Sequence, residues 1–529
     1  MPSNTTHTLG KSALPLTPVL FQWQPIAGVL ITGVVFDRLF WEAWIGLNLS
    51  LFSLWVVLLV VWRYGWDNLS LPARAAFFGT LLAGAMVYVH HSIIAVSATL
   101  LSLGVFTALA HEHRLRTLAY AVPQLLRAFI LTPLRAWEGL DALFRSAGSR
   151  GTVLRWIRVA LLPILIGVLF FQLYRAGNPR FDGMAAGFLG DLSVVISGIF
   201  TPHTCFVLFG LMISATLVGR QAPGSLATFE ERWTDALIRT RKERPLVVVA
   251  RPLDLLERER RAGLILLVLV NLLLFVVNAI DIEWVWIRFE VPSAFSLKQF
   301  VHTGTWMLII SILLSMVILL HVFRGNQNFY ARSRSLKWLA SVWIAQNFIL
   351  GISVLLRNYH YITFHGLAYK RIGVIVFLAL VMIGLVTLYV KVLRRKSFFF
   401  LVRVNAWAWF SMMLGLATVD WDSYIVRHNL RHGNPGEIDI DNYLVMSDKV
   451  LPLLYATMDV VEAQMEKHRA NEVLWVQNLD PVRFRQALNV KCVRFLRRCA
   501  DQQWREHNLA DERTRRDLLA CMSSHRPAR

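Results

Sequence analysis

The stretch from Leu355 to Val374, LLRNYHYITFHGLAYKRIGV, lies between two long apolar runs and gathers side chains that could bind a ligand or transfer a proton. The part between Arg357 and Lys370 carries no charge, yet it holds two histidines, three tyrosines and one glycine. His360 and His365 are not spaced to lie on one helical face, so we predict no metal site here. The candidate functional rim consists of Arg357, His360, Tyr361, His365 and Arg371.

Four amides inside apolar runs form a second candidate. Asn271 and Asn278 are seven residues apart, on one face of a helix, and Gln346 and Asn347 lie in the middle of another run. Amides in membrane bundles usually join helices by hydrogen bonds worth about 1 kcal/mol, which is the favoured interpretation. The alternative is a polar path through the bundle.

The remaining titratable groups indicate little chemistry. His90 and His91 suit the polar tip of a helical hairpin better than a metal site, because adjacent residues on a helix point in different directions. Cys492 and Cys499 are about 10 Å apart along one predicted helix, too far for a disulfide. The sequence has no Ser-His-Asp order, HExxH motif or Gly-rich phosphate loop. An enzyme is therefore not favoured, and no cofactor is expected.

The composition determines which elements position these residues. Of 529 residues, 56% are hydrophobic and only 17% are charged, and the mean hydropathy is +0.49. Soluble domains carry roughly 25% charged residues. The net charge of +21 is spread over short loops rather than gathered in one patch, which argues against nucleic-acid binding. The predicted fold class is all-α, a polytopic transmembrane helical bundle in the lipid bilayer.

Apolar runs bounded by charges predict about ten or eleven spans. One short run, Pro25–Val35, suits either a tilted short helix or a surface segment. The ten long runs are residues 43–62, 74–89, 92–110, 157–173, 203–219, 262–280, 303–323, 337–356, 371–393 and 398–418.

The loops alternate in charge. Residues 324–337 and 391–403 hold four and five Lys/Arg without an acid, whereas residues 281–302 hold two against three acids. Cation-rich loops stay in the cytoplasm. This pattern predicts that the candidate functional rim and the C-terminal tail lie on the outer, periplasmic side.

The tail differs in composition from the rest of the chain. We predict an N-terminal tail at 1–24, a transmembrane helical domain at 25–418 and an extramembrane amphipathic helical tail at 419–529. Asp480 and Pro481 suit the N-cap and first turn of a helix. Five apolar residues then follow at helical spacing: Phe484, Leu488, Cys492, Phe495 and Cys499.

Several segments resemble a family of bacterial polytopic inner-membrane proteins known only as a domain of unknown function (4173/4153-like). Leu356-Arg357, Tyr361, Gly366-Leu367 and Arg371 match its Leu-Arg, Tyr and Gly-Leu-Thr-x-x-Arg elements, with Ala368 in place of the Thr. The tail carries a second ordered set: Asn429, Asp441, Tyr443, Leu444, Ser447, Asp448 and Pro452. The resemblance runs from about Val34 to Leu454 and implies a bacterial inner-membrane location, but no activity.

Three functions remain open. The first is an envelope binding or scaffold protein whose tail engages a protein partner. The second is a transporter or channel for a small solute that uses the four amides. The third is a transferase for lipid or envelope precursors. It requires the candidate functional rim to converge with tail acids. We expect Arg357 or Arg371 to pair with a tail carboxylate; the candidates are Asp420, Asp422, Asp439 and Asp441.

Overall fold

The computed structural model describes residues 23–146, parts of 160–188, and residues 201–219, 225–239, 252–289, 304–432, 438–470 and 479–524. The chain forms two compact units, one of residues 1–41 and 128–221 and the other of residues 42–127 and 222–529. Within the described residues all regular elements are helices, apart from one isolated bridge between Ala236 and Lys396. The predicted all-α fold class is confirmed.

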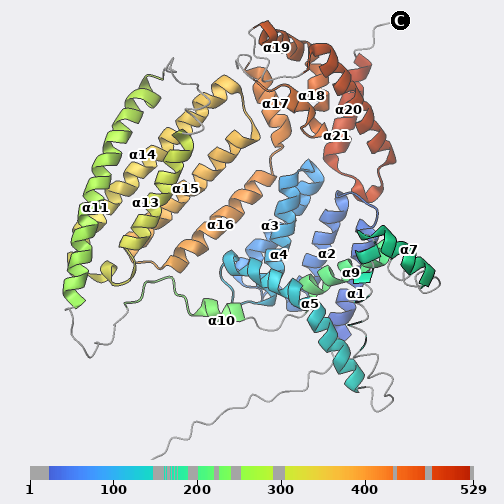
Figure 1. Ribbon diagram of the computed structural model, residues 1–529, viewed down its shortest axis with the longest axis horizontal. Helices are drawn as coiled ribbons and strands as arrows, with labels where there is room; N and C mark the ends of the chain where they lie inside the picture. The colour runs from blue at the N-terminus through green and yellow to red at the C-terminus, as the bar shows by residue number, and fades with distance from the viewer. Residues whose placement is uncertain are drawn as a thin grey trace, which may run out of the picture. The chain divides into compact units, whose positions relative to one another are not determined.

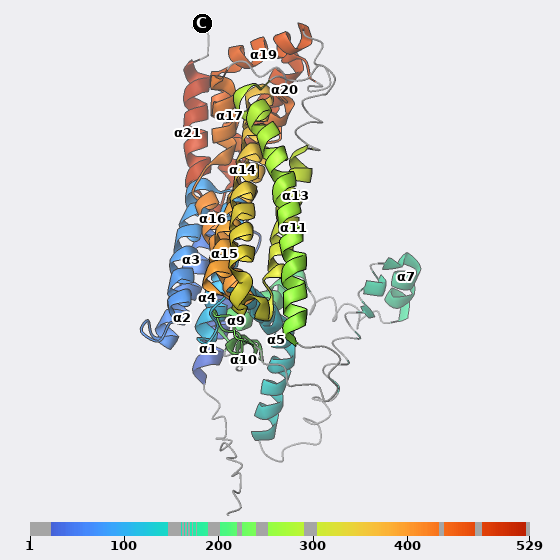
Figure 2. The same ribbon diagram turned by 90° about the vertical axis from the view of Figure 1, so that its left-hand side faces the viewer.

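The larger unit contains a bundle of long apolar helices (Figures 1 and 2). Among the described residues, eight helices are long and apolar enough to cross a membrane. They are α2 (Leu47–Tyr64), α3 (Leu71–His90), α4 (Ile93–His111), α11 (Pro252–Asp281) with its π-helical continuation η1 (Ile282–Ile287), α13 (Thr305–Val322), α14 (Arg334–His365), α15 (Tyr369–Arg394) and α16 (Phe398–Ala417).

These eight helices correspond to eight of the ten predicted long runs. The run at 203–219 is the shorter apolar helix α9 (Pro202–Val218), and the run at 157–173 lies largely outside the described residues. Pro25–Val35 is part of α1 (Trp23–Phe40), which is not among the eight.

Local sequence sets the helix boundaries and the closeness of packing. Ser70, Ser92 and Ser397 are N-caps whose hydroxyls accept a bond from the backbone N–H three residues on. The buried face of α3 is built from small residues such as Ala76, Gly79 and Ala83. Small residues let membrane helices approach closely, which explains the extensive pairing of α3 with α4.

The smaller unit is organised by α1 and α9. A methyl group on Gly33 would lie 2.5 Å from Leu211, and one on Gly210 would lie 2.5 Å from Phe36. The two helices therefore touch through glycines. Asp37 at the end of α1 bonds to His203 of α9 at 2.8 Å.

Between α4 and α11 the structure also describes three helices besides α9. They are α5 (Leu118–Ser146), α7 (Pro179–Phe188) and α10 (Ser225–Glu231).

The cation-rich segments of the larger unit meet at one end of its bundle. The Tyr330 hydroxyl donates to Glu257 at 2.9 Å, which joins the segment after α13 to the start of α11. The Ser397 N–H donates to the Asp235 carbonyl at 2.8 Å, at the start of α16. Arg395 lies 5.4 Å from the centre of the Phe329 ring, so the two cation-rich loops, residues 324–337 and 391–403, are neighbours in space.

The helices that follow α16 lie at the opposite end of this bundle, and we call the described part of residues 419–524 the C-terminal domain (Figures 1 and 2). Short 3₁₀ turns at Asp441–Leu444 (η5), Asp448–Val450 (η6) and Trp504–Glu506 (η7) connect its longer helices. Those helices are α17 (Trp421–Arg431), α18 (Leu451–Ala456), α19 (Met458–Ala470), α20 (Pro481–Asp501) and α21 (Leu509–Ser524).

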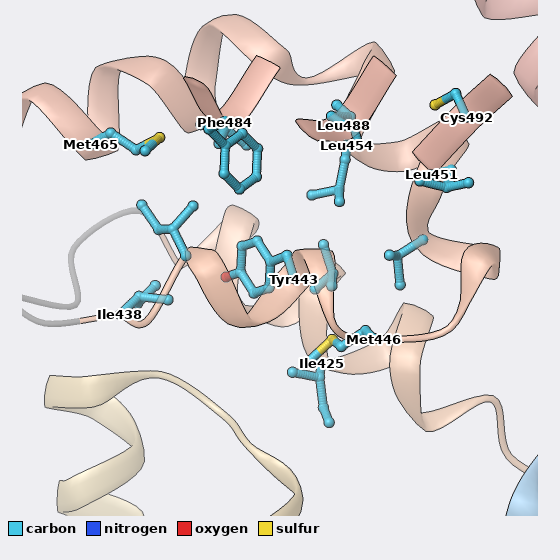
Figure 3. Close-up of a cluster of buried hydrophobic side chains, with 14 of the residues drawn as sticks. Ile425, Ile438, Tyr443, Met446, Leu451, Leu454, Met465, Phe484, Leu488 and Cys492 are labelled. Atoms are coloured by element: carbon cyan, nitrogen blue, oxygen red, sulfur yellow. The ribbon is translucent and has the colours of Figure 1, made fainter. Parts of the chain in front are cut away.

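This domain has its own apolar core (Figure 3). Asp480 caps α20 by accepting a bond from the Arg483 N–H at 2.8 Å, as predicted. Four of the five stripe residues are buried, and the fifth, Cys499, packs against the same core.

The core also includes Leu367 and Ile372 from the turn between α14 and α15 and the first turn of α15. The domain is thus continuous with the end of the bundle. The predicted boundary at 418/419 stays a prediction.

Candidate functional site

The candidate functional rim divides into two groups. Arg357 turns into the bundle, where its Nη2 bonds Oδ1 of Asp281 at 2.5 Å and both side chains are less than 10% exposed. His360 stacks on Phe289 with ring centroids 3.9 Å apart and bonds the Val285 carbonyl. Arg357 therefore faces the end of α11, and His360 faces η1 and Phe289.

Tyr361, His365 and Arg371 form the second group. The guanidinium of Arg371 lies 4.6 Å from the centre of the Tyr361 ring. It donates to the carbonyls of His365 and Gly366, at the end of α14. Gly366 has a φ of +76°, a conformation that suits glycine. Arg371 therefore closes the turn between α14 and α15.

The predicted pairing of Arg357 or Arg371 with a tail carboxylate is wrong within the described residues. Arg357 pairs with Asp281, and Arg371 donates to the His365 carbonyl at the turn between α14 and α15. The physical reason is proximity: Arg357 lies eight residues before the end of α14, so it meets its helical neighbours before it can reach the C-terminal domain. Within the described residues, the two arginines point to different places and do not converge with the tail acids in one groove.

The four amides also separate by role. Gln346 donates to Asn271 at 2.9 Å, and Asn278 donates to the Gln346 carbonyl at 3.0 Å. Asn347 bonds back to Trp343 within its own helix. Three of the four therefore join α11 to α14, together with the Asp281–Arg357 pair, which supports the interpretation as interhelical bonds.

The four tail acids lie in two places. Asp439 accepts a bond from the Asn442 N–H at 3.2 Å, and Asp441 accepts one from the Leu479 N–H at 3.2 Å, both within the C-terminal domain. Asp420 and Asp422 instead belong to a polar cluster around Lys449 at the junction with the bundle.

We call this cluster the junction network. Lys449, with a side chain only 7% exposed, donates to Asp420 at 2.7 Å and to the His90 carbonyl at the end of α3 at 3.0 Å. Asp422 accepts bonds from Tyr369 of α15 at 2.7 Å and from Ser447 at 2.6 Å. Side chains of the C-terminal domain thus bind two separate helices of the bundle.

Asn429 makes a further attachment beside the junction network. Its Oδ1 accepts from the Leu367 N–H at 2.6 Å, and its Nδ2 donates to the Leu367 carbonyl at 3.0 Å. It therefore satisfies both backbone groups of a residue in the turn between α14 and α15. Asn429 and Leu367 are both buried.

The start of α2 makes a third attachment. The Leu47 N–H donates to the His507 carbonyl at 3.0 Å, and the Trp44 N–H donates to the Glu506 carboxylate at 3.0 Å. A methyl group on Gly46 would lie 2.1 Å from the Glu506 carbonyl oxygen, so only glycine permits this approach. His91, at the tip of the α3–α4 hairpin, lies 4.0 Å from Asp511.

The electrostatics of the junction network favour fixed charges. Burial opposes ionisation of Asp420, but the charge of Lys449 and bonds from Lys449 and Ser423 outweigh it and hold the pKa of Asp420 below its usual value. Lys449 is an ammonium held by acceptors on several sides, an arrangement suited to holding elements together rather than to nucleophilic chemistry. The described residues contain no group of three His, Cys, Asp or Glu side chains that could hold a metal.

A pocket of about 540 Å³ adjoins the junction network. We call it the junction pocket. Its polar lining includes His90, Asp420, Tyr424, Arg427, Lys449 and Arg513. Sequence reasoning missed Lys449, Arg427 and Arg513. The available signal was Lys449 itself, a lone cation directly before an apolar run, which suggests a buried partner.

No curated protein and no solved structure matches the chain. A family profile described as a domain of unknown function, DUF4153, matches residues 76–456, which is more than half of the chain. This segment includes all five residues of the candidate functional rim and the whole junction network. On this evidence the chain belongs to the DUF4153 family, a domain of unknown function, as the resemblance of its motifs predicts.

Proposed function

We propose that the protein is a binding or scaffold protein of the bacterial envelope, in which the bundle fixes the C-terminal domain at the outer surface of the inner membrane. One observation carries the proposal: the domain is attached to α2, α3 and the α14–α15 turn at once. Three separate attachments hold a surface in a constant orientation, which lowers the entropic penalty of binding a partner.

The surface that this domain presents is one face of α20. Val482, Val490 and Val493 are 66%, 58% and 47% exposed, and their spacing puts them on one stripe. Arg494 and Arg497 are exposed on the same stretch. Apolar side chains mixed with arginines are typical of protein interfaces.

A pocket of about 580 Å³ lies along this face. Val490, Lys491 and Arg494 line it from α20, and Leu444 and Asp448 line it from the opposite side. A cationic rim around apolar contacts suits an acidic, amphipathic segment of another envelope protein.

The location on the outer side is supported by charge. The cation-rich segments meet at one end of the bundle, and the C-terminal domain lies at the other (Figure 1). Retention of Lys and Arg in the cytoplasm then directs the domain outward.

A single cysteine tests this location. In a chain whose four native cysteines are replaced by alanine, Val490→Cys is expected to react with a membrane-impermeant maleimide in intact cells. Labelling that requires cell lysis would place the domain in the cytoplasm.

Photocrosslinking tests the partner. A photoreactive residue at Val490 is expected to give one discrete protein adduct that is lost on Arg494→Glu. The same group at Leu519 of α21, which is 46% exposed, is the matched control. Absence of an adduct, or equal adducts at both positions, contradicts the proposal.

A transporter is the second candidate, and the Asp281–Arg357 pair favours it. Both residues lie within candidate spans, and the π-helix η1 follows Asp281 directly. Ion pairs inside spans often mark ion or proton pathways, and π-helices are frequent at functional sites. Proteoliposomes under a pH gradient would show proton flux that Asp281→Asn abolishes; equal flux in empty liposomes would reject this candidate.

A further inference from the structure

We propose that the junction pocket binds the phosphate headgroup of an anionic phospholipid from the surrounding bilayer. The proposal concerns a different site from the α20 face and does not depend on the scaffold function. Three features of the pocket support the proposal: its arginines, its position at the ends of the membrane spans and its apolar lining.

Two arginines face the pocket without a compensating acid. Arg427 comes from α17 and Arg513 from α21, and both side chains are exposed. Within the described residues neither has a carboxylate within 4 Å. The nearby acids are engaged elsewhere, since Asp420 holds Lys449 and Asp517 contacts Arg516 at 3.3 Å.

This arrangement selects an anion rather than a metal ion. Guanidinium groups bind phosphate oxygens in pairs of parallel hydrogen bonds, and arginines from two helices can hold one phosphate between them. The pocket lining holds three cationic side chains, Arg427, Lys449 and Arg513, against two carboxylates, Asp420 and Asp517, so it favours an anion.

The pocket lies where the membrane spans end. Val89 is one residue before the end of α3, and Val419 is two residues after the end of α16; both line the pocket. Phospholipid headgroups occupy this level of a bilayer. Tyr424, half exposed at the pocket, is an aromatic residue of the kind found at that boundary.

The rest of the lining is apolar. Val89, Val419, Pro452, Leu453 and Ala510 form a surface suited to the glycerol and upper acyl carbons of a lipid. A volume of about 540 Å³ is typical of a small-ligand site rather than a protein interface. Phosphate contacts beside an apolar surface describe a phospholipid better than a free phosphate ion.

Native mass spectrometry of the delipidated full-length protein tests the proposal. Short-chain phosphatidylglycerol is titrated against the protein, with phosphatidylcholine of the same chain length as the neutral comparison. We expect selective binding of phosphatidylglycerol, weakened at least tenfold in the double variant Arg427→Gln/Arg513→Gln.

The matched control is Arg431→Gln/Arg515→Gln, which removes the same charge from exposed positions of the same two helices. It is expected to change the affinity less than twofold. Slow thiol labelling of buried Cys492 verifies that both double variants remain folded.

Three results would overturn the proposal. Equal binding of the two lipids would show that the protein does not recognise the headgroup charge. Equal losses of affinity in the two double variants would show that the lipid does not bind at Arg427 and Arg513. Displacement of phosphatidylglycerol by inorganic phosphate at equal concentration would show that the pocket recognises phosphate alone and not a lipid.

Discussion

The attachment of the C-terminal domain through Asn429 gives a prediction whose magnitude follows from the structure. Asn429→Ala removes the two hydrogen bonds to Leu367 and leaves a buried N–H and a buried carbonyl without partners. Each such group costs about 1–3 kcal/mol, and partial entry of water lowers the sum, so we expect about 2–4 kcal/mol. At about 1.4 kcal/mol per factor of ten, the opening equilibrium rises roughly 30- to 1,000-fold.

Cys492 provides the assay. Its side chain is only 1% exposed in the core that contains Leu367, and burial raises the pKa of its thiol to about 11. A maleimide therefore reacts with it only after the domain opens, and the labelling rate measures the opening equilibrium. The three other cysteines are replaced by alanine, so that one thiol is followed.

Asn489→Ala is the control, because Asn489 is an exposed asparagine on α20. Its labelling rate is expected to stay within twofold of the parent chain. An Asn429→Ala rate less than threefold above that of the control would refute the reasoning, since the two bonds would then not hold the domain closed.

Three further predictions use the same chain. Gly366→Ala places a methyl group 2.8 Å from a side-chain oxygen at a φ of +76° and is expected to raise the thiol-labelling rate at least tenfold, whereas Gly373→Ala, which meets open space, leaves it unchanged. Asp281→Asn removes the negative charge that faces the buried Arg357 guanidinium and is expected to lower the stability of the bundle by about 3–5 kcal/mol, measured as detergent-solubilised thermal unfolding; an unchanged Tm would show that the pair contributes nothing. Because the folded state holds the pKa of Asp420 below its ordinary value of 3.8, this group stabilises the fold above that pH and loses its contribution as the pH falls below it; a Tm series from pH 5 to 3 is expected to fall less steeply in Asp420→Asn.

Much of the candidate site was visible in the sequence only as separate residues. The stretch Leu355–Val374 was recognisable, and it does form the end of α14, the turn and the start of α15. Its partners were not predictable. Arg357 meets Asp281, 76 residues away, and Lys449 meets the carbonyl of His90, 359 residues away. No local pattern encodes which of several acids or carbonyls will lie within reach of a cation.

The sequence by itself determined the elements and their environment. The length of an apolar run determines how much free energy the run gains when it leaves water. Eight of the predicted runs accordingly form long apolar helices in the structure. The 3.6-residue period of α20 likewise determined which of its residues are buried. Both properties are sums over neighbouring residues, and local sequence contains them completely.

Only the tertiary structure decided how the elements are joined. It placed the C-terminal domain against α2, α3 and the α14–α15 turn, and it assembled the junction pocket from segments more than 300 residues apart in the chain. These contacts depend on the relative positions of helices, which follow from the packing of the whole unit. A pair of charges gains its free energy only at a distance of a few ångströms, and that distance is a property of the fold.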